Sequence, residues 1–219
     1  MNKKRILKKT QVKSINKIAD GVYILSFVRD FQFSAGQVIA IDIESNGNPR
    51  IYSIASGEND VLVDILFDEK PEGHLTPLLS NLKPGEFIYI SEPFGTFCTT
   101  IDKAYWMAAG TGIAPFISMS RSGYAFNNTL IHGGKTDENF YFSELLQPIF
   151  QDKYIRCCSQ QLDTQNYKGR LTEWLKSNES LDIDCNFMLC GSPEMVVEVR
   201  DILISKGVLF RNIISETYF

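Results

Sequence analysis

Short runs of apolar residues, many with alternating polar positions, fill the first 100 residues of the chain. They are rich in Val, Ile, Tyr and Phe and are separated by turn sequences such as NGNP and KPGE. This pattern is typical of short strands in a small antiparallel barrel. One helical pattern, HLTPLLSNL, interrupts it. The six predicted strands contain VKSI, GVYILSF, QVIAIDI, RIYSIAS, VLVDILF and EFIYISE.

The pattern changes near residues 97–103, after which apolar strand patterns alternate with helical ones. The strand KAYWMAAG precedes the helical stretch APFISMSRS, and NFMLCG precedes PEMVVEVRDILISKG. Strand–helix repeats predict a parallel sheet covered by helices on both faces. We therefore predict two domains, an antiparallel β-barrel in residues 1–100 and an α/β domain with a parallel sheet in residues 101–219.

Composition is that of an ordinary folded chain. Of the 219 residues, 44% are hydrophobic and 22% are charged, which is enough apolar side chain to form a core. No apolar run approaches the roughly 20 residues that a membrane helix needs. The start, MNKKRILKKTQVK, lacks the apolar core of a secretion signal. We therefore expect a cytoplasmic protein without membrane association.

The spacing of the cysteines and the distribution of charge limit which cofactors and partners the chain can have. The five cysteines lack the spacing of a disulfide framework, a zinc site or an iron–sulfur cluster, so no metal is expected and any redox group would be organic. The formal net charge is −4, yet residues 1–17 hold seven Lys and Arg and no acid. This asymmetry indicates an acidic partner or simply a solvated strand. Nucleic acid is disfavoured because basic and aromatic residues are not interleaved.

Two glycine turns stand where a strand of the second half gives way to a helix. Gly110-Thr111-Gly112 follows YWMAA, and Cys190-Gly191 follows NFML. Glycines allow close approach of a pyrophosphate, and a helix start offers free N–H groups. Pro115 replaces the third glycine of the usual dinucleotide fingerprint, so a plain glycine turn is the alternative interpretation. Strand ends of a parallel sheet meet at one edge, so both turns can serve one crevice.

The first half carries two further candidate segments. In the strand Arg50-Ile51-Tyr52-Ser53, alternation sends Arg50 and Tyr52 to one face. That face offers a guanidinium for phosphate and an aromatic ring for stacking. The only helix of this half opens with Gly73-His74-Leu75-Thr76, whose N–H groups and hydroxyl suit an anion. A structural helix cap is the equally simple alternative.

Taken in order, these motifs resemble the ferredoxin–NADP reductase family. R-x-Y-S, the glycine-led helix start, G-T-G-I-A-P and C-G-x-P-x-M follow one another along nearly the whole chain. F-x-x-G-Q at 33–37 and E-P-F-G-T-F at 92–97 extend the match. The ending Glu216-Thr217-Tyr218-Phe219 is similar to that of the bacterial subgroup. The resemblance implies an oxidoreductase with bound FAD and a nicotinamide dinucleotide.

The resemblance also implies roles for individual residues around the flavin. Arg50 would pair with the FAD pyrophosphate, and Ile51 would belong to the same cofactor-binding strand. Tyr52 would stack on the isoalloxazine, with Ser53 hydrogen-bonded near N5. Tyr218 would cover the opposite ring face and move aside for nicotinamide, and Phe219 would stack on the adenine. Glu216 is the candidate proton relay. The pyrophosphate would be held by Gly73, His74, Leu75 and Thr76.

On the nucleotide side, the resemblance implies that Gly110, Thr111 and Gly112 hold the dinucleotide phosphates, while Cys190 and Gly191 border the nicotinamide. Members that select NADPH often carry Ser-Arg after the third sheet strand, where this chain has Ser159-Gln160. Gln160 still donates hydrogen bonds, and the remaining basic candidates are Lys135 and Arg170. NADPH is therefore expected, with NADH possible.

The implied activity is hydride transfer between NADPH and FAD, coupled to single-electron exchange with an acidic ferredoxin or flavodoxin. Two alternatives stay open. One is an NAD(P)H-dependent reductase component that serves an oxygenase or another acceptor. The other is a flavin-binding regulatory module without turnover, which the nicotinamide half of the motif set argues against.

Overall fold

In a computed structural model, the structure describes residues 5–98 and 103–218. The chain divides into two compact units, the first made of residues 1–98 and 117–122 and the second of residues 99–116 and 123–219. The predicted boundary between residues 100 and 101 falls outside the described residues and stays a prediction.

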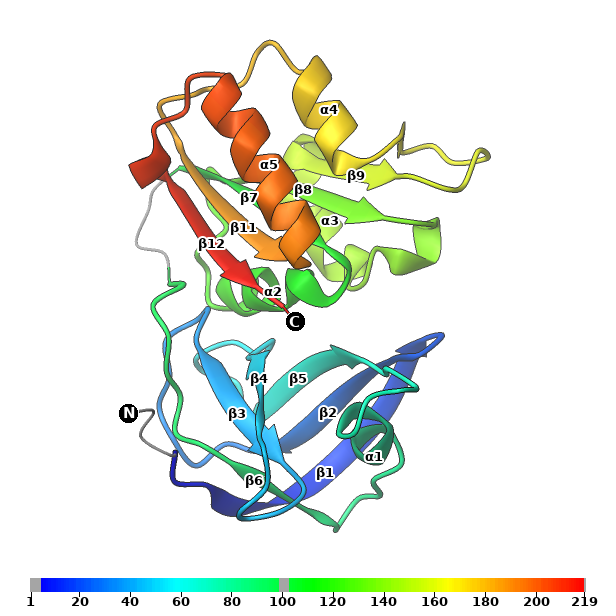
Figure 1. Ribbon diagram of the computed structural model, residues 1–219, viewed down its shortest axis with the longest axis vertical. Coiled ribbons are helices and arrows are strands. Elements are labelled where there is room, and N and C mark those ends of the chain that lie inside the picture. Colours follow the sequence, from blue (N-terminus) through cyan, green and yellow to red (C-terminus); the bar gives the residue numbers. More distant parts are fainter. Residues whose placement is uncertain (1–4, 99–102, 219) are drawn as a thin grey trace. The chain divides into compact units, whose positions relative to one another are not determined.

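The first unit is a curled, fully antiparallel six-stranded sheet with the order β4-β3-β6-β1-β2-β5 (Figure 1). A bridge between Ile54 and Ile65 links the end of β4 to β5, the two edges of the sheet. This confirms the predicted barrel, in the form of a curled sheet. Its strands are β1 (Lys8–Ala19), β2 (Val22–Val28), β3 (Val38–Asp42), β4 (Arg50–Ser53), β5 (Leu62–Asp68) and β6 (Phe87–Ile90), and its helix is α1 (Thr76–Ser80).

The F-x-x-G-Q and E-P-F-G-T-F segments meet inside this unit. Gly36 has φ +93°, and a Cβ built on it would lie 1.9 Å from the main-chain oxygen of Phe97. Val38 pairs with Phe94 in an isolated antiparallel bridge. Only glycine permits this approach, so the two motifs are parts of one packed junction.

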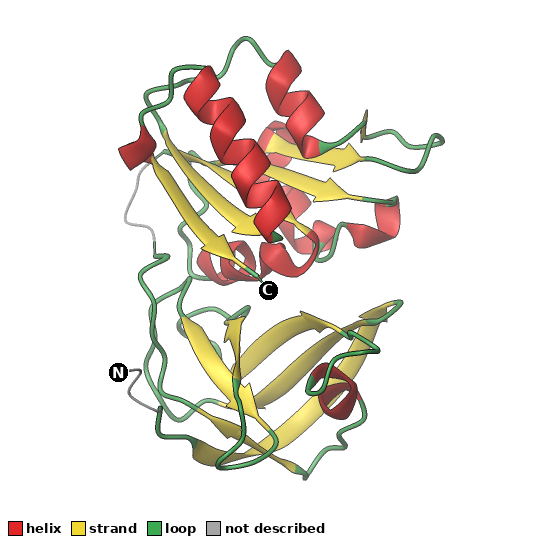
Figure 2. Ribbon diagram, in the orientation of Figure 1, coloured by secondary structure: helices red, strands yellow, loops and turns green. Residues whose placement is uncertain are grey.

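The second unit is a parallel six-stranded sheet with the order β10-β9-β8-β7-β11-β12. Helices lie on both of its faces (Figure 2), as the strand–helix alternation predicts. Its strands are β7 (Ala104–Ala109), β8 (Thr129–Gly134), β9 (Tyr154–Cys158), β10 (Tyr167–Lys168), β11 (Asn186–Gly191) and β12 (Ile213–Thr217), and its helices are α3 (Ser143–Phe150), α4 (Leu171–Ser177) and α5 (Pro193–Ser205). The sequence pattern did not predict β10, because two residues display no period.

The two faces of this sheet differ in character. Met107, Ile131 and Leu189 join an aliphatic cluster with residues of α4 and α5. Residues one position away point to the other face, where Trp106 stacks on Phe116 and meets Phe150 edge-on. Tyr154, His132 and Phe140 continue this aromatic row. One face of the sheet formed by β7, β8 and β9 is therefore packed with aromatic rings.

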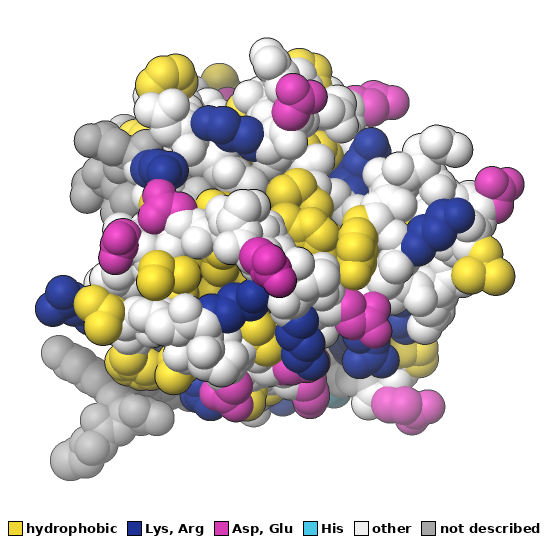
Figure 3. All heavy atoms as spheres, turned by 90° about the horizontal axis from the view of Figure 1, so that it is seen from above, with side chains coloured by type: hydrophobic (Ala, Val, Ile, Leu, Met, Phe, Trp, Pro, Cys, Tyr) yellow, Lys and Arg dark blue, Asp and Glu magenta, His cyan; other side chains and the backbone are white. Residues whose placement is uncertain are grey.

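Surface features add two observations. No helix among the described residues is long and apolar enough to cross a membrane. On the face shown in Figure 3, basic and acidic side chains are interspersed among apolar patches.

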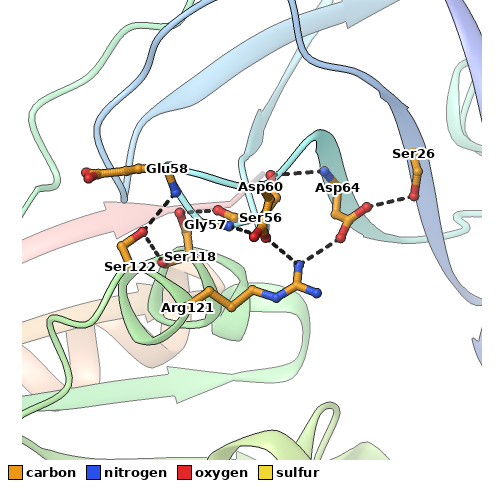
Figure 4. Close-up of polar contacts among 9 residues, drawn as sticks. All are labelled: Ser26, Ser56, Gly57, Glu58, Asp60, Asp64, Ser118, Arg121 and Ser122. Carbon is orange, nitrogen blue, oxygen red and sulfur yellow. Dashed lines mark hydrogen bonds and ion pairs between the residues drawn. The ribbon is translucent and has the colours of Figure 1, made fainter.

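Polar contacts fasten residues 117–122, which include most of α2 (Ala114–Arg121), to the first unit. The Ser118 hydroxyl donates to the Ser56 carbonyl at 2.7 Å, and the Ser122 hydroxyl accepts from the Glu58 N–H at 3.0 Å (Figure 4). The Arg121 guanidinium lies 2.8 Å from Asp64. The loop after β4 is thus held by several directed contacts.

Replacing Arg121 with Met should lower the free energy of unfolding by about 1 kcal/mol, because Arg121 reaches both Asp64 and Asp60 while keeping 31% of its side chain exposed. Urea unfolding of FAD-loaded protein measures the loss. Arg200→Met is the matched control, since Arg200 pairs with its exposed neighbour Asp201. Equal losses in both variants would contradict a specific contribution of Arg121.

Candidate functional site

The ends of β11 and β12 bring together three of the predicted catalytic residues. Cys190 lies opposite Glu216 in the parallel register, and the Tyr218 N–H donates to the Gly191 carbonyl at 2.9 Å. The Tyr218 side chain also lies close enough to Cys190 to lower the pKa of its thiol. Two neighbouring strand ends therefore position a thiol, a carboxylate and a phenol side by side.

Cys190 is protonated in this environment. The side chain is fully buried, and burial raises the pKa of its thiol well above the usual value, with the Glu216 carboxylate adding to the rise and the Tyr218 side chain opposing it. A neutral thiol is a poor nucleophile. Cys190 is therefore not suited to form a covalent intermediate.

The two glycine turns are in direct contact, which confirms that they share one edge of the sheet. A Cβ on Gly112 would lie 2.4 Å from the Cys190 carbonyl oxygen. Gly110 adopts φ +57° with no atom within 4 Å of its Cβ position, so one side of the turn is open. The turn forms the short helix η1 (Gly110–Ile113), which leads directly into α2. Thr111, in the same turn, is half-buried.

Behind the first turn lies a residue that the sequence analysis did not single out. His132 in β8 is completely buried, and its Nδ1 lies 3.0 Å from the Tyr154 hydroxyl. Burial, with a smaller contribution from Arg156, lowers the pKa of His132 to about 3, although the main chain of Gly110 opposes the shift. The only sequence signal is a histidine in an apolar strand, TLIHGG, which core packing explains equally well.

The predicted adenosine-side residues follow the ends of β8, β9 and β10. The Gln160 N–H donates to the Lys135 carbonyl at 2.8 Å, and the Ser159 hydroxyl donates to the Gly134 carbonyl. Arg170 caps the start of α4. These hydrogen bonds hold Ser159 and Gln160 against the segment after β8, whereas no hydrogen bond or ion pair among the described residues joins Arg170 to them.

An acid that the sequence analysis overlooked stands in the same region. Asp137 accepts from the Thr164 hydroxyl at 2.7 Å and from the Asn166 amide at 2.8 Å. These hydrogen bonds, that of Thr164 above all, lower the pKa of Asp137. Gln161, next to Gln160, also donates to this carboxylate. The negative charge of Asp137 is therefore held by Gln161, the residue next to Gln160, which is expected to face the nucleotide.

In the first unit, β4 presents the predicted flavin-binding strand. Arg50 and Ile51 are exposed, Tyr52 is half-buried, and Ser53 is 2% exposed. The Tyr52 ring meets Phe67 edge-on at 6.3 Å. Burial raises the pKa of Tyr52, so its hydroxyl stays protonated. Since Ile54 pairs with Ile65, the antiparallel register carries Tyr52 towards β5 and Arg50 towards the segment that follows it.

That segment leads into Gly73, His74, Leu75 and Thr76. The Thr76 hydroxyl accepts from the Lys70 N–H at 2.8 Å, and Leu75 is buried in the core of the unit. Within the described residues, no hydrogen bond reaches the N–H groups of His74 and Thr76, and Arg50 forms no ion pair. Unpaired N–H groups and an exposed guanidinium fit a diphosphate, and the Tyr52 ring, on the same face of the strand as Arg50, can stack on an apolar ring.

The prediction that Phe219 stacks on the adenine concerns a residue outside the described ones. Among those described, no group of three or more His, Cys, Asp and Glu is placed to hold a metal ion. The individual ligand contacts expected from the resemblance stay predictions.

A barrel with an anion-receptive strand and a parallel sheet with two touching glycine turns define a flavin- and nicotinamide-dependent oxidoreductase. Two family models agree: residues 9–98 match the oxidoreductase FAD-binding domain, and residues 107–201 match the oxidoreductase NAD-binding domain. A flavodoxin/ferredoxin–NADP reductase of Rhodobacter capsulatus is 30% identical over 212 residues, covering 81% of this chain and 77% of that protein. The chain belongs to the ferredoxin–NADP reductase family.

Two other similarities frame the range of functions. The electron transfer component of toluate 1,2-dioxygenase from Pseudomonas putida is 23% identical over 94% of this chain, which spans 66% of that protein. A ferredoxin NADP+ reductase from Neisseria gonorrhoeae, solved with bound FAD and NADP, shares the fold with a TM-score of 0.88 at 21% identity and covers 98% of this chain and 99% of its own.

Proposed function

We propose that this oxidoreductase transfers hydride between NADPH and FAD and exchanges single electrons with ferredoxin or flavodoxin. The gathering of Cys190, Glu216 and Tyr218 against the Gly112 turn carries the proposal, because it places polar and ionisable groups at the strand ends, where ligands of parallel sheets bind. The reductase from Rhodobacter capsulatus, a flavodoxin/ferredoxin–NADP reductase by name, supports the choice of carrier.

Bound FAD supplies the two-electron chemistry and its division into single electrons. The protein binds FAD and the nicotinamide nucleotide and orients them relative to each other. Arg50 and the N–H groups of His74 and Thr76 hold the diphosphate, Tyr52 provides a stacking ring, and the Ser53 hydroxyl donates near N5. Fixing both reactants in one geometry removes much of the entropic barrier to hydride transfer.

On the nucleotide side, Thr111 and its flanking glycines bind phosphates through main-chain N–H groups, while Cys190 borders the nicotinamide. Glu216, which is half-buried beside Cys190, is the proposed relay for the proton that accompanies electron transfer. Lys135, Ser159, Gln160 and Arg170 face the adenosine phosphate. These basic and hydrogen-bonding residues favour NADPH over NADH. The Asp137 carboxylate weakens this preference, because its negative charge repels the phosphate.

A direct test is anaerobic addition of NADPH to the purified protein. A yellow protein that bleaches on NADPH and then reduces ferredoxin or flavodoxin supports the proposal, and kcat/KM with NADPH should exceed that with NADH. A flavin that neither nucleotide reduces would refute enzymatic function.

The second candidate is a reductase component for an oxygenase. The similarity to the toluate dioxygenase component over 94% of this chain supports it, as does Gln160 in place of an arginine. A preference for NADH, with fast reduction of an oxygenase-type ferredoxin and slow reduction of flavodoxin, would favour this candidate.

Removing Tyr218 and Phe219 should tighten NADP+ binding by roughly tenfold, because nicotinamide would no longer compete with an aromatic ring for the flavin face. The dissociation constant, measured from the flavin difference spectrum, checks this. Tyr218→Phe is the matched control, since it keeps the ring and loses only the hydroxyl. If the truncated chain and the Phe variant bind NADP+ equally, Tyr218 does not gate the site.

The proposed acidic carrier makes a further prediction about β1. Lys8 pairs with Asp30 and Lys9 lies over the Phe87 ring, whereas exposed Lys13 forms no ion pair with the described residues. Replacing Lys9 and Lys13 with Gln should slow carrier reduction roughly threefold at low salt, since steering acts on the association rate.

Stopped-flow reduction of the carrier at increasing ionic strength measures this effect. A small neutral acceptor should be reduced at an unchanged rate. The variant with Gln at the exposed positions Lys153 and Lys168 of the second unit serves as the control of equal charge. Parallel salt curves for all three proteins would reject docking through β1.

A further inference from the structure

Leu162 is the most exposed large hydrophobic residue among the described residues of the second unit, with 85% of its surface accessible. It lies in the loop 159–166, which joins β9 to β10 and extends beyond the carboxyl ends of β8 and β9 (Figure 1). A single exposed leucine on a loosely held surface loop would need no explanation. The contacts of this loop, however, hold it firmly.

One side chain, that of Asp137, binds both sides of the loop. On the side that follows β9, the Gln161 amide donates to the Asp137 carboxylate at 3.1 Å and accepts from the Asp137 N–H at 2.9 Å. On the side that precedes β10, Thr164 and Asn166 donate to the same carboxylate at 2.7 and 2.8 Å. The Gln161 amide also donates to the Asp163 carbonyl at 2.9 Å, which closes the tip of the loop.

Both partners in these contacts are anchored in the second unit. Asp137 opens the short helix η2 (Asp137–Asn139), whose start is closed by reciprocal hydrogen bonds between Thr136 and Asn139. Thr164 is buried, and its hydroxyl also accepts from the Asn166 N–H at 3.1 Å. Because the loop is ordered before a ligand arrives, an apolar contact made at its tip costs little conformational entropy.

The neighbours of Leu162 indicate what its side chain contacts. Gln160 stands two residues earlier in the same loop and is one of the residues proposed to face the adenosine phosphate. The others are Lys135, Ser159 and Arg170. The functional groups of all four are polar, and they supply hydrogen bonds and positive charge. Adenine is a flat ring with two apolar faces, and sites for such rings combine a few polar groups with apolar side chains.

We infer that Leu162 contacts the adenine ring of the bound dinucleotide, from a loop that Asp137 holds in place. This inference rests on the proposed placement of the adenosine beside Ser159 and Gln160. Adenine is common to NADPH and NADH, so Leu162 would contribute equally to the binding of both. Gln160, in contrast, would act only on the phosphate that distinguishes them.

Leu162→Ser should weaken binding of NADP+ and NAD+ by the same factor, about fivefold, because the apolar surface that adenine covers is lost. Leu162→Phe should bind both at least as tightly as the parent protein, since an aromatic ring stacks on adenine. Isothermal titration calorimetry of FAD-loaded protein measures these affinities.

Leu209→Ser is the matched control, because Leu209 is also exposed but precedes the start of β12, at the opposite ends of the parallel strands. Equal affinities in the two serine variants would overturn the inference. A loss confined to NADP+, or a Phe variant that binds as weakly as Leu162→Ser, would overturn it as well.

A second variant tests the role of Asp137. Thr164→Val keeps the size of the buried side chain and removes its hydrogen bond to the carboxylate, and it should weaken NADP+ binding about threefold. The double variant with Leu162→Ser should bind no more weakly than Leu162→Ser alone, because both changes act through one contact. Additive losses would show that the loop acts on the nucleotide without Leu162 and would contradict the inference.

Nitrogen-15 NMR separates this outcome from that of the proposed function. NADP+ added to the parent protein should shift the amide signals of Ser159, Gln160 and Leu162. Binding without shifts at Ser159 and Gln160 would refute the proposed placement of the adenosine, and the inference with it. Shifts at these two residues, together with an unchanged affinity of Leu162→Ser, would refute only the role of Leu162.

Discussion

Substituting Gly112 with Ala should reduce kcat/KM for NADPH by about a hundredfold or more while leaving FAD bound. The new Cβ would stand 2.4 Å from the Cys190 carbonyl oxygen and 2.8 Å from the Gly191 Cα, and neither main-chain atom can swing away as a side chain would. The two turns must therefore separate. A displacement of about 1 Å in a binding surface commonly costs a hundredfold in rate.

Steady-state kinetics and the flavin absorbance of the purified variant together check this expectation. Gly123→Ala is the control, because Gly123 also has a positive φ, +87°, but no atom lies within 4 Å of its Cβ position. That variant should lose about 1 kcal/mol of stability and little activity. Near-normal turnover of the Gly112 variant would show that contact between the turns does not shape the nucleotide site.

The second large effect concerns the contact between Gly36 and Phe97 within the FAD-binding unit. Gly36→Ala should lower the free energy of unfolding of that unit by at least about 3 kcal/mol and abolish FAD retention, since it combines a main-chain clash with backbone strain. The Cβ would lie 1.9 Å from the Phe97 oxygen, and φ is +93°.

The loss of stability and of FAD in the Gly36 variant is measured by flavin release during thermal unfolding. Gly21→Ala separates strain from clash, because Gly21 has φ +67° in the turn between β1 and β2 with open space around it. It should cost about 1 kcal/mol and leave FAD bound. Comparable losses at both positions would mean that the contact with Phe97 is dispensable.

The sequence is sufficient to predict the architecture because the apolar period is strong throughout. Alternation in stretches such as RIYSIAS marks the barrel strands, and continuous runs such as NFMLCG mark buried parallel strands. The two glycine turns could also be predicted, since each follows such a run. That they touch follows from the neighbouring positions of β7 and β11, which alternation of strands and helices leaves undetermined.

Other parts of the site depend on distant contacts and leave no local pattern. Nothing near His132 in sequence indicates that Tyr154, on the next strand, will meet its Nδ1. Asp137 gains its partners from a loop 27 to 29 residues away. Likewise, Gly36 resembles any turn glycine until Phe97 is seen against it. Tertiary packing, rather than propensity, selects these residues.

The burial of Cys190 has a consequence for durability in air. Reduced flavoproteins that meet oxygen can generate peroxide, and peroxide oxidises thiolates far faster than thiols. A sulfur that is fully enclosed and kept protonated would resist conversion to sulfenic acid even where oxidant is produced. The oxidoreductase would thus keep a polarizable sulfur atom at the end of β11 that the peroxide it generates does not oxidise. Thiol-blocking reagents should likewise leave its turnover unchanged.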